Sequence, residues 1–233
     1  MNIAIVLSGG VGSRMGLSIP KQFIEVSGVP VIEYCLKSLI HHPKIDAVII
    51  GVADEWLSFV KECVKRVGTK KPVYYSKPGE IRQGSIINAL KEANKQGAKQ
   101  TDIVLIHDAA RPLLSEKLIT DCLKACEEAD AVLPVIPVKD TTYLSRDGKH
   151  IDSLLERKTL WNGQAPEAFK FGSYYEANMK LSEEELNRIT GSTEVSYRVG
   201  LKCVLIPGDT NNFKITTPED LSNFESIIKN EGI

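Results

Sequence analysis

The chain has 233 residues, and its 42% hydrophobic and 25% charged content is that of a globular protein that folds without disulfide bonds. Its net charge is −1, with basic and acidic residues interspersed, so we expect no nucleic-acid partner. No apolar run approaches the roughly 18 to 20 residues that span a membrane, so we expect no membrane partner either. The five cysteines form no CxxC pair, and we expect reduced thiols and a cytoplasmic protein.

Short apolar runs alternate along the chain with longer amphipathic segments. The runs at 2–7, 47–52, 103–107 and 131–136 are rich in β-branched residues, as strands buried on both faces are. Apolar residues with helical spacing occupy 30–41, 54–67, 81–96 and 115–129. This alternation predicts an α/β fold, a doubly wound, mostly parallel sheet with helices on both faces.

The pattern changes at residue 138. Residues 138–160 hold two β-like halves around the sequence RDGK at 146–149, a strong hairpin-turn signal. A projecting hairpin of this length cannot bury both faces alone, so we predict a dimerisation arm and a homodimer. A strand returns at 202–207, and a final helix is predicted with Thr217 as its cap and Pro218 in its first turn. No linker divides the chain, so we expect one domain over 1–233.

Residues 7–12, with the sequence LSGGVG, follow the first predicted strand. In an open α/β sheet, ligands bind beyond the carboxyl ends of the strands. Gly9, Gly10 and Gly12 let backbone N–H groups approach a phosphate closely, and Arg14 and Lys21 supply charge nearby. The stretch matches neither a P-loop nor a GxGxxG fingerprint. Taken alone, it fits a phosphate-binding loop and a plain flexible loop equally well.

Polar side chains mark two further places where strands and helices meet. Asp108 follows the apolar run at 103–107, and a lone carboxylate beside phosphate oxygens is a usual way to hold Mg²⁺; a turn cap is the alternative. We interpret its neighbours His107 and Arg111 as structural. Arg82 and Ser85 open the predicted helix at 81–96, whose N-terminus favours anions, although Ser85 would also serve as a cap.

Four motifs in order along the chain narrow the class. They are GGVGSRMGLSIPKQ at 9–22, RQGS at 82–85, HDAARP at 107–112 and NNFKITTPEDL at 211–221. Together they resemble the 2-C-methyl-D-erythritol 4-phosphate cytidylyltransferase family, including its relatives that act on ribitol 5-phosphate. The resemblance covers nearly the full chain and implies a Rossmann-like nucleotidyltransferase fold. It also implies a reaction in which a polyol phosphate attacks the α-phosphorus of CTP and pyrophosphate leaves.

The resemblance assigns roles to particular residues. It implies that Arg14, Lys21 and Lys214 are catalytic and that Asp108 holds Mg²⁺ or another divalent cation. The nucleotide is expected to bind Leu7, Ser8, Gly9, Gly10, Gly12, Gly79, Arg82 and Ser85. The acceptor is expected to bind Asn211 and, from the arm of the neighbouring subunit, Thr141 and Arg157. Each active site of the homodimer would then be composite.

The acceptor side departs from the methylerythritol pattern. Ala165 and Asn211 stand where those enzymes usually have threonine and aspartate, and Thr190 and Glu194 have no adjacent acidic pair beside them. The opening LSGG is closer to the ribitol-phosphate relatives, whereas HDAARP is closer to the methylerythritol group. The resemblance implies methylerythritol phosphate as the best single acceptor, with ribitol 5-phosphate or another alditol phosphate as the alternative. Outside cytidylyl transfer, a sugar-1-phosphate nucleotidyltransferase, a glycosyltransferase and a non-catalytic nucleotide-binding module remain competing classes.

Overall fold

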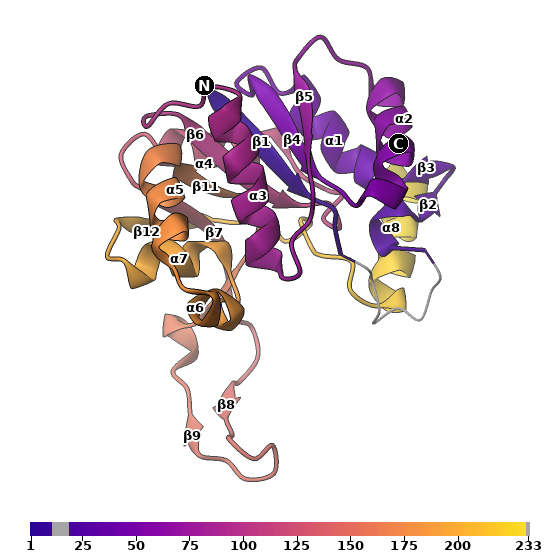
Figure 1. Ribbon diagram of the computed structural model, residues 1–233. Helices are drawn as coiled ribbons and strands as arrows, with labels where there is room; N and C mark the ends of the chain where they lie inside the picture. The colour runs from indigo at the N-terminus through magenta and orange to yellow at the C-terminus, as the bar shows by residue number, and fades with distance from the viewer. Residues whose placement is uncertain (11–18, 232–233) are drawn as a thin grey trace.

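The fold is built on one central sheet, shown in the computed structural model of the protein, which describes residues 1–10 and 19–231 (Figure 1). Within that part of the chain the strand order is β10-β7-β11-β6-β1-β4-β5, and β12 also pairs with β7. The strands are β1 (Asn2–Leu7), β4 (Ala47–Gly51), β5 (Val73–Ser76), β6 (Ile103–Asp108), β7 (Ala131–Pro137), β10 (Trp161–Gly163), β11 (Glu167–Lys170) and β12 (Cys203–Pro207).

The sheet is mostly parallel, as predicted. β1 runs parallel to β4 and β6, β4 to β5, and β12 to β7. The exceptions are β11, which lies antiparallel between β6 and β7, and the edge strand β10, antiparallel to β7. The carboxyl ends of β1, β4 and β6 therefore meet at one edge of the sheet, where ligands bind in folds of this kind.

Helices cover both faces of the sheet. One face carries α1 (Val31–His41), α2 (Leu57–Val67) and α4 (Glu116–Ala125), and the other carries α3 (Arg82–Lys95), α5 (Phe171–Lys180) and α7 (Ser192–Arg198) (Figure 1). Alternate residues of β1 enter the two layers: Ala4 and Val6 pack in the first core, Ile3 and Ile5 in the second. This two-sided burial explains why the strand reads as a continuous apolar run.

The C-terminal helix α8 (Pro218–Glu231) packs against α1, where the rings of Phe224 and Tyr34 meet edge to face 5.0 Å apart. The Thr217 hydroxyl accepts the Asp220 N–H at 3.2 Å, so the predicted cap and the first-turn Pro218 are confirmed. Beside α8 lies the short hairpin of β2 (Glu25–Val26) and β3 (Val29–Pro30) (Figure 1). The remaining short elements are η2 (Lys21–Phe23), η3 (Asp54–Trp56), η4 (Arg157–Thr159) and α6 (Glu183–Arg188).

The predicted arm is a hairpin that projects from the body of the protein (Figure 1). Its strands β8 (Tyr143–Leu144) and β9 (Ser153–Leu154) pair antiparallel. The turn is fixed by Asp147, which accepts the N–H groups of Lys149 and His150, each at 2.8 Å, and by Gly148 at φ 69°. Large apolar side chains of the arm, Tyr143, Leu144, Ile151 and Leu154, are exposed in the single chain.

The cysteines are free thiols, and four of the five are buried. Burial raises the pKa of Cys35 and of Cys63 to about 12, which makes them inert core residues rather than nucleophiles. In the part of the chain that the structure describes, we find no helix with the length and apolarity needed to cross a bilayer.

Candidate active site

A cavity of about 570 Å³ opens at the carboxyl ends of β1 and β6. It gathers nine of the residues predicted from the sequence: Leu7, Gly9, Gly10, Lys21, Gly79, Arg82, Ser85, Asp108 and Lys214. Of the other predicted residues, Ser8 turns its hydroxyl away to donate to the Gly51 carbonyl at 2.7 Å. Gly12 and Arg14 lie outside the described residues.

Gln22 contacts the backbone at the start of the glycine-rich loop. It is buried, and its Nε2 donates to the carbonyl of Ser8 at 2.6 Å and to that of Gly10 at 2.9 Å. Gln22 therefore fixes the backbone at Ser8 and Gly10 through both carbonyls. The sequence prediction missed this residue, although the PKQ ending of the motif contained it.

The second loop of the cavity, at the start of α3, depends on close backbone contact. The Gly79 N–H donates to Ser85 Oγ at 3.0 Å, and that hydroxyl reaches the Ile81 carbonyl at 3.3 Å. A Cβ added at Gly79 would lie 2.5 Å from the carbonyl carbon of Gly84. A side chain at 79 is therefore excluded by packing against the first turn of α3.

This close contact gives a stability prediction. Gly79→Ala should lower the free energy of unfolding by about 1–3 kcal/mol, because backbone has to move to admit the methyl group. Gly10→Ala is the matched control, since a Cβ there meets no atom of the described residues within 4 Å. Urea unfolding of the two variants checks this; equal stability of the two would show that the loop at 79 relaxes freely.

Asp108 is the electrostatic centre of the cavity. Its carboxylate lies 2.9 Å from Lys214 Nζ, 3.4 Å from Arg82 Nη2 and 3.7 Å from Arg111 Nε. Burial alone would raise the pKa of Asp108, but the charges of Arg82, Lys214 and Arg111 outweigh it and hold that pKa well below its usual range. The carboxylate is therefore ionised at any working pH and keeps three cations beside the cavity.

Arg82 is held between two carboxylates. Besides Asp108, it lies 3.6 Å from Glu167 Oε1, and its Nη1 donates to Ser192 Oγ at 2.7 Å. Glu167 is itself fixed by the N–H and hydroxyl of Thr193, at 2.8 and 2.6 Å. This buried glutamate lies at the end of the QAPE segment, and the sequence prediction assigned it no role.

A second lobe of about 330 Å³ adjoins the cavity and shares Arg82, Asp108 and Lys214 with it. Its other polar lining residues are Arg111, Gln164, Glu167, Thr190, Thr193 and Glu194. The positively charged Arg82 and Lys214 thus lie at the junction of the two lobes. Hydroxyl and carboxylate groups line the second lobe. Ala165, Thr190 and Glu194, which the sequence set apart, all line this lobe.

Three predicted acceptor residues lie elsewhere in the single chain. Asn211 lines a separate groove on the other side of its loop, whereas its buried neighbour Asn212 donates to the Ala165 carbonyl at 2.6 Å behind the second lobe. Thr141 and Arg157 are exposed on the arm, and Arg157 Nη1 donates to the Lys139 carbonyl at 3.0 Å.

His107 and Arg111 tie the strand end to the loop that follows. His107 is fully buried, and its Nε2 donates to the Arg111 carbonyl at 2.9 Å. Arg111 Nη1 in turn donates to the Asn212 carbonyl at 2.7 Å. Both contacts agree with the structural interpretation of these residues. Burial lowers the pKa of His107 to about 4, so its imidazole is neutral.

The donor set at Asp108 limits the metal that it suits. The described residues contain no cluster of three or more side chains able to ligate a metal. One carboxylate fits Mg²⁺, which keeps several waters and is completed by substrate phosphates. It does not fit zinc, which needs three or four protein ligands.

Comparison with known proteins first gives the class: the relatives of this chain are named cytidylyltransferases, and the chain is an enzyme of the nucleotidyltransferase class. The family model described as 2-C-methyl-D-erythritol 4-phosphate cytidylyltransferase matches residues 2–230, and the chain belongs to that family. The resemblance seen in the sequence motifs is thereby confirmed.

Two curated relatives carry different substrate names. The chain is 36% identical over 228 residues to the 2-C-methyl-D-erythritol 4-phosphate cytidylyltransferase of Clostridium botulinum, covering 97% of this chain and 98% of that protein. It is 31% identical over 235 residues to the ribitol-5-phosphate cytidylyltransferase of Lacticaseibacillus paracasei, covering 100% of both. The crystal structure of 4-diphosphocytidyl-2C-methyl-D-erythritol synthase from Anaerococcus prevotii matches with a TM-score of 0.84 at 24% identity, over 98% of this chain and 96% of that one. That likeness supports the predicted fold.

Proposed function

We propose that the protein transfers CMP from CTP to a polyol phosphate and releases pyrophosphate. The observation that carries this proposal is the junction of the two lobes, where Arg82, Asp108 and Lys214 line both. The glycine loop and Gly79 supply backbone for a nucleotide in the larger lobe. The smaller lobe then receives the acceptor, so that the acceptor phosphate and the α-phosphate of CTP meet at the junction.

The chemistry asks for charge stabilisation and positioning. An oxygen of the acceptor phosphate forms a bond to the α-phosphorus as the bond to the bridging oxygen of pyrophosphate breaks. Negative charge gathers on the equatorial oxygens and on the leaving group. Lys21, Lys214 and Arg82 line the cavity where that charge would develop, and preorganised cations of this kind stabilise the transition state more than the ground state.

We propose Mg²⁺ as the cofactor, held by Asp108. When bound, the ion neutralises phosphate oxygens and orients them. Lys214 and Arg82 balance the Asp108 carboxylate in the absence of substrate, at 2.9 and 3.4 Å. Both side chains are about one-third exposed, at 35% and 32%, so they can turn toward incoming phosphates.

The acceptor is proposed from the relatives and the second lobe. We take 2-C-methyl-D-erythritol 4-phosphate as the best single acceptor and ribitol 5-phosphate as the alternative, since relatives of both names align over at least 97% of the chain. Thr190, Thr193 and Glu194 offer partners for acceptor hydroxyls. Both substrates are water-soluble, and we propose that the enzyme acts in the cytoplasm.

The test is a matrix of nucleotides and acceptors with pyrophosphate release as the readout. CTP, UTP, GTP and ATP are each combined with methylerythritol 4-phosphate, ribitol 5-phosphate and glycerol phosphates, with Mg²⁺. We expect release with CTP and one polyol phosphate. Release with UTP or GTP and a sugar 1-phosphate, added as a further well, would assign the rival class. Absence of CTP binding in calorimetry would overturn the proposal.

We also propose a homodimer whose active sites are completed by the partner's arm. The arm exposes an apolar set that one chain leaves uncovered, with Tyr143 54%, Ile151 68% and Leu154 64% exposed. Hydrophobic side chains gathered on a projecting hairpin are typical of a subunit interface. Docking of the arm would also bring Arg157, whose planar guanidinium suits a phosphate, toward the acceptor lobe of the neighbour.

A mixing experiment tests this composite site. Arg157→Ala and Lys214→Ala should each lower kcat/KM by about 30-fold, the usual cost of losing a charged hydrogen-bonding partner of a phosphate. If Arg157 acts in the neighbouring subunit, equal mixing of the two variants should restore about one quarter of wild-type activity, because half the dimers are mixed and each has one intact site. Activity that stays at the level of the separate variants would place Arg157 in its own subunit's site.

A further inference from the structure

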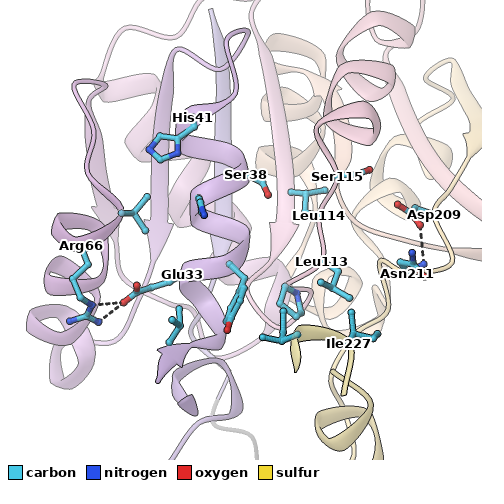
Figure 2. A pocket seen from close by; sticks show the side chains of 16 residues that line it. Glu33, Ser38, His41, Arg66, Leu113, Leu114, Ser115, Asp209, Asn211 and Ile227 are labelled. Carbon is cyan, nitrogen blue, oxygen red and sulfur yellow. Dashed lines mark hydrogen bonds and ion pairs between the residues drawn. The ribbon is translucent and has the colours of Figure 1, made fainter. Parts of the chain in front are cut away.

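A groove of about 600 Å³ lies on the opposite side of the loops that carry the catalytic residues. It is bounded by α1, the end of α2, the segment after β6, the segment after β12, and α8. Figure 2 shows Ser38 and His41 on α1, with Leu113, Leu114 and Ser115 between that helix and the pair Asp209 and Asn211. Its volume lies in the range of ordinary small-molecule sites.

The groove shares a wall with the catalytic cleft, the name used here for the candidate active-site cavity together with its second lobe. Asp108, Ala110 and Arg111 line the lobes of the cleft, whereas the next four residues, 112–115, line the groove. In the other loop, Lys214 and Thr216 line the cleft, whereas Asp209 and Asn211 line the groove. Two loops therefore carry catalytic groups on one side and groove residues on the other.

These two loops are bonded into one unit. Arg111 Nη1 donates to the Asn212 carbonyl at 2.7 Å, and the Ile215 N–H donates to the Ala110 carbonyl at 2.9 Å. Gln164, which lines the second lobe, donates to the Asp209 carbonyl at 2.9 Å and accepts the Asp209 N–H at the same distance. A ligand that moves 112–115 or 209–211 would therefore move Asp108 or Lys214 as well.

The lining of the groove indicates the kind of ligand. Half of its lining side chains are apolar, among them Val29, Tyr34, Val67, Leu113 and Ile227. Glu33 is buried and neutralised by Arg66, to which it is hydrogen-bonded (Figure 2). On the wall formed by the segment after β12, Asp209 accepts the Asn211 N–H at 2.9 Å and has no cationic partner among the described residues.

Lys37 is the charged residue of the α1 wall that lacks a counterpart. Among the residues that the structure describes, it has no hydrogen-bond or ion-pair partner, and it lies on α1 between Glu33 and His41. The α1 wall of the groove therefore carries one uncompensated positive charge beside apolar side chains, which favours a ligand with an apolar body and one acidic group placed at that wall.

We propose that this groove is a second ligand site, which binds a small amphipathic anion, an apolar ring or short chain with one acidic group, and that its occupancy changes the affinity of the catalytic cleft for nucleotide. The binding part stands on the groove alone. The coupling part rests on the proposed function, since it needs CTP in the larger lobe. By linkage, CTP must change the affinity for the anion by the same factor.

The binding test uses 2-naphthoate as the probe and neutral 2-naphthalenemethanol as its comparator, in equilibrium dialysis against the full chain. We expect saturable binding of one naphthoate per chain. Lys37→Gln should weaken naphthoate binding by about fivefold, the effect of losing one partly exposed ion pair, and leave the neutral compound unchanged. Lys91→Gln, an exposed lysine of α3 on the opposite face of the sheet, is the matched control and should change neither.

Ser38→Trp should fill the groove and block both compounds. Binding that does not saturate, or that Lys37→Gln and Ser38→Trp leave unchanged, would overturn the proposal. A loss of mass on Ser38→Trp in light scattering would overturn it too, because a second copy would then occupy the groove. If Ser38→Trp does not fold, the comparison of the two compounds in Lys37→Gln decides the question.

The coupling test is a CTP titration by calorimetry with and without saturating 2-naphthoate. We expect the CTP dissociation constant to change at least threefold in the wild type. A CTP dissociation constant that stays unchanged while naphthoate is bound would overturn the proposed coupling, and the proposed binding site in the groove would still stand. If CTP does not bind at all, the proposed function is wrong. The dialysis experiment still tests whether the groove binds naphthoate.

Discussion

Asp108→Asn is expected to lower kcat by at least about 100-fold, the scale of losing a preorganised charge-stabilising group. In the proposed reaction this carboxylate holds Mg²⁺ and also keeps Lys214 and Arg82 at the junction of the lobes. The amide that replaces it can do neither, because it carries no charge. A steady-state assay with CTP, Mg²⁺ and the active acceptor measures the effect.

The same variant leaves three cations without their shared anion. We expect the free energy of unfolding to fall by about 2 kcal/mol, less than for a fully buried pair because Arg82 and Lys214 are partly exposed. Pyrophosphate without metal should then stabilise Asp108→Asn more than the wild type, since the polyanion takes the place of the carboxylate. Thermal unfolding with and without pyrophosphate measures this difference.

Asp121→Asn is the matched control for both measurements. It removes an acid that pairs with Lys117 on the exposed surface of α4, away from the cavity. It should leave kcat unchanged and shift stability by no more than about 0.5 kcal/mol. The role given to Asp108 would be wrong if Asp108→Asn kept a tenth of the wild-type kcat, or if pyrophosphate stabilised all three proteins equally.

The sequence predicted the parts of the fold whose signal is local and strong. β1, β4, β6 and β7 lie in the predicted apolar runs because each is buried by helices on both faces. β5 escaped prediction because it is a short edge strand whose first three residues are only half-buried. β11 escaped because four residues carry no periodicity, and its antiparallel place between β6 and β7 is decided by tertiary pairing.

The residues of the candidate site also differ in whether a local sequence signal marks them. Gly9, Gly10, Arg82, Ser85 and Asp108 lie next to strand ends or a helix start, where the sequence pattern could locate them, and all five line the cavity. Glu167 has no such mark: its importance comes from Arg82, which is distant in the sequence and contacts it only in the folded chain. Sequence reasoning finds residues that are positioned by a turn or a motif. It misses residues whose importance comes from a contact with a residue distant in the sequence.

Asn211 and Asn212 are a second case in which the sequence does not show which residue faces the site. The two are identical in type and adjacent, yet Asn212 is buried beside the second lobe while Asn211 is exposed toward the groove. Nothing in the sequence distinguishes them, because the turn at Asp209 decides which side each one faces. A specificity role for this loop is therefore better sought at Asn212.

His107 should make stability depend on pH in the weakly acidic range. Its pKa is about 4 in the folded protein, lowered chiefly by burial, against about 6.5 for an unfolded histidine. The unfolded chain therefore binds the proton first, so this contribution to stability is complete above pH 6.5 and is lost progressively down to about pH 4. The full loss amounts to about 3 kcal/mol.

The local contacts give the reason. Nε2 donates to the Arg111 carbonyl, and Nδ1 is buried without a hydrogen-bond partner among the described residues. A proton added at Nδ1 would put a second charge beside the guanidinium of Arg111 and near Lys214, and the Asp108 carboxylate offsets only part of that cost. Neutral imidazole is thus the form that this strand end accommodates.

Urea unfolding from pH 8 to pH 4.5, at constant protein concentration, compares the wild type with His107→Gln. Glutamine keeps a donor for the Arg111 carbonyl but binds no proton, so its stability should fall less steeply below pH 6.5, even though it is less stable at pH 8 by about 1 kcal/mol. His150→Gln on the exposed arm controls for the loss of a histidine as such. Parallel curves for the wild type and His107→Gln would show that His107 titrates alike in both states, and that water or loop movement reaches this strand end.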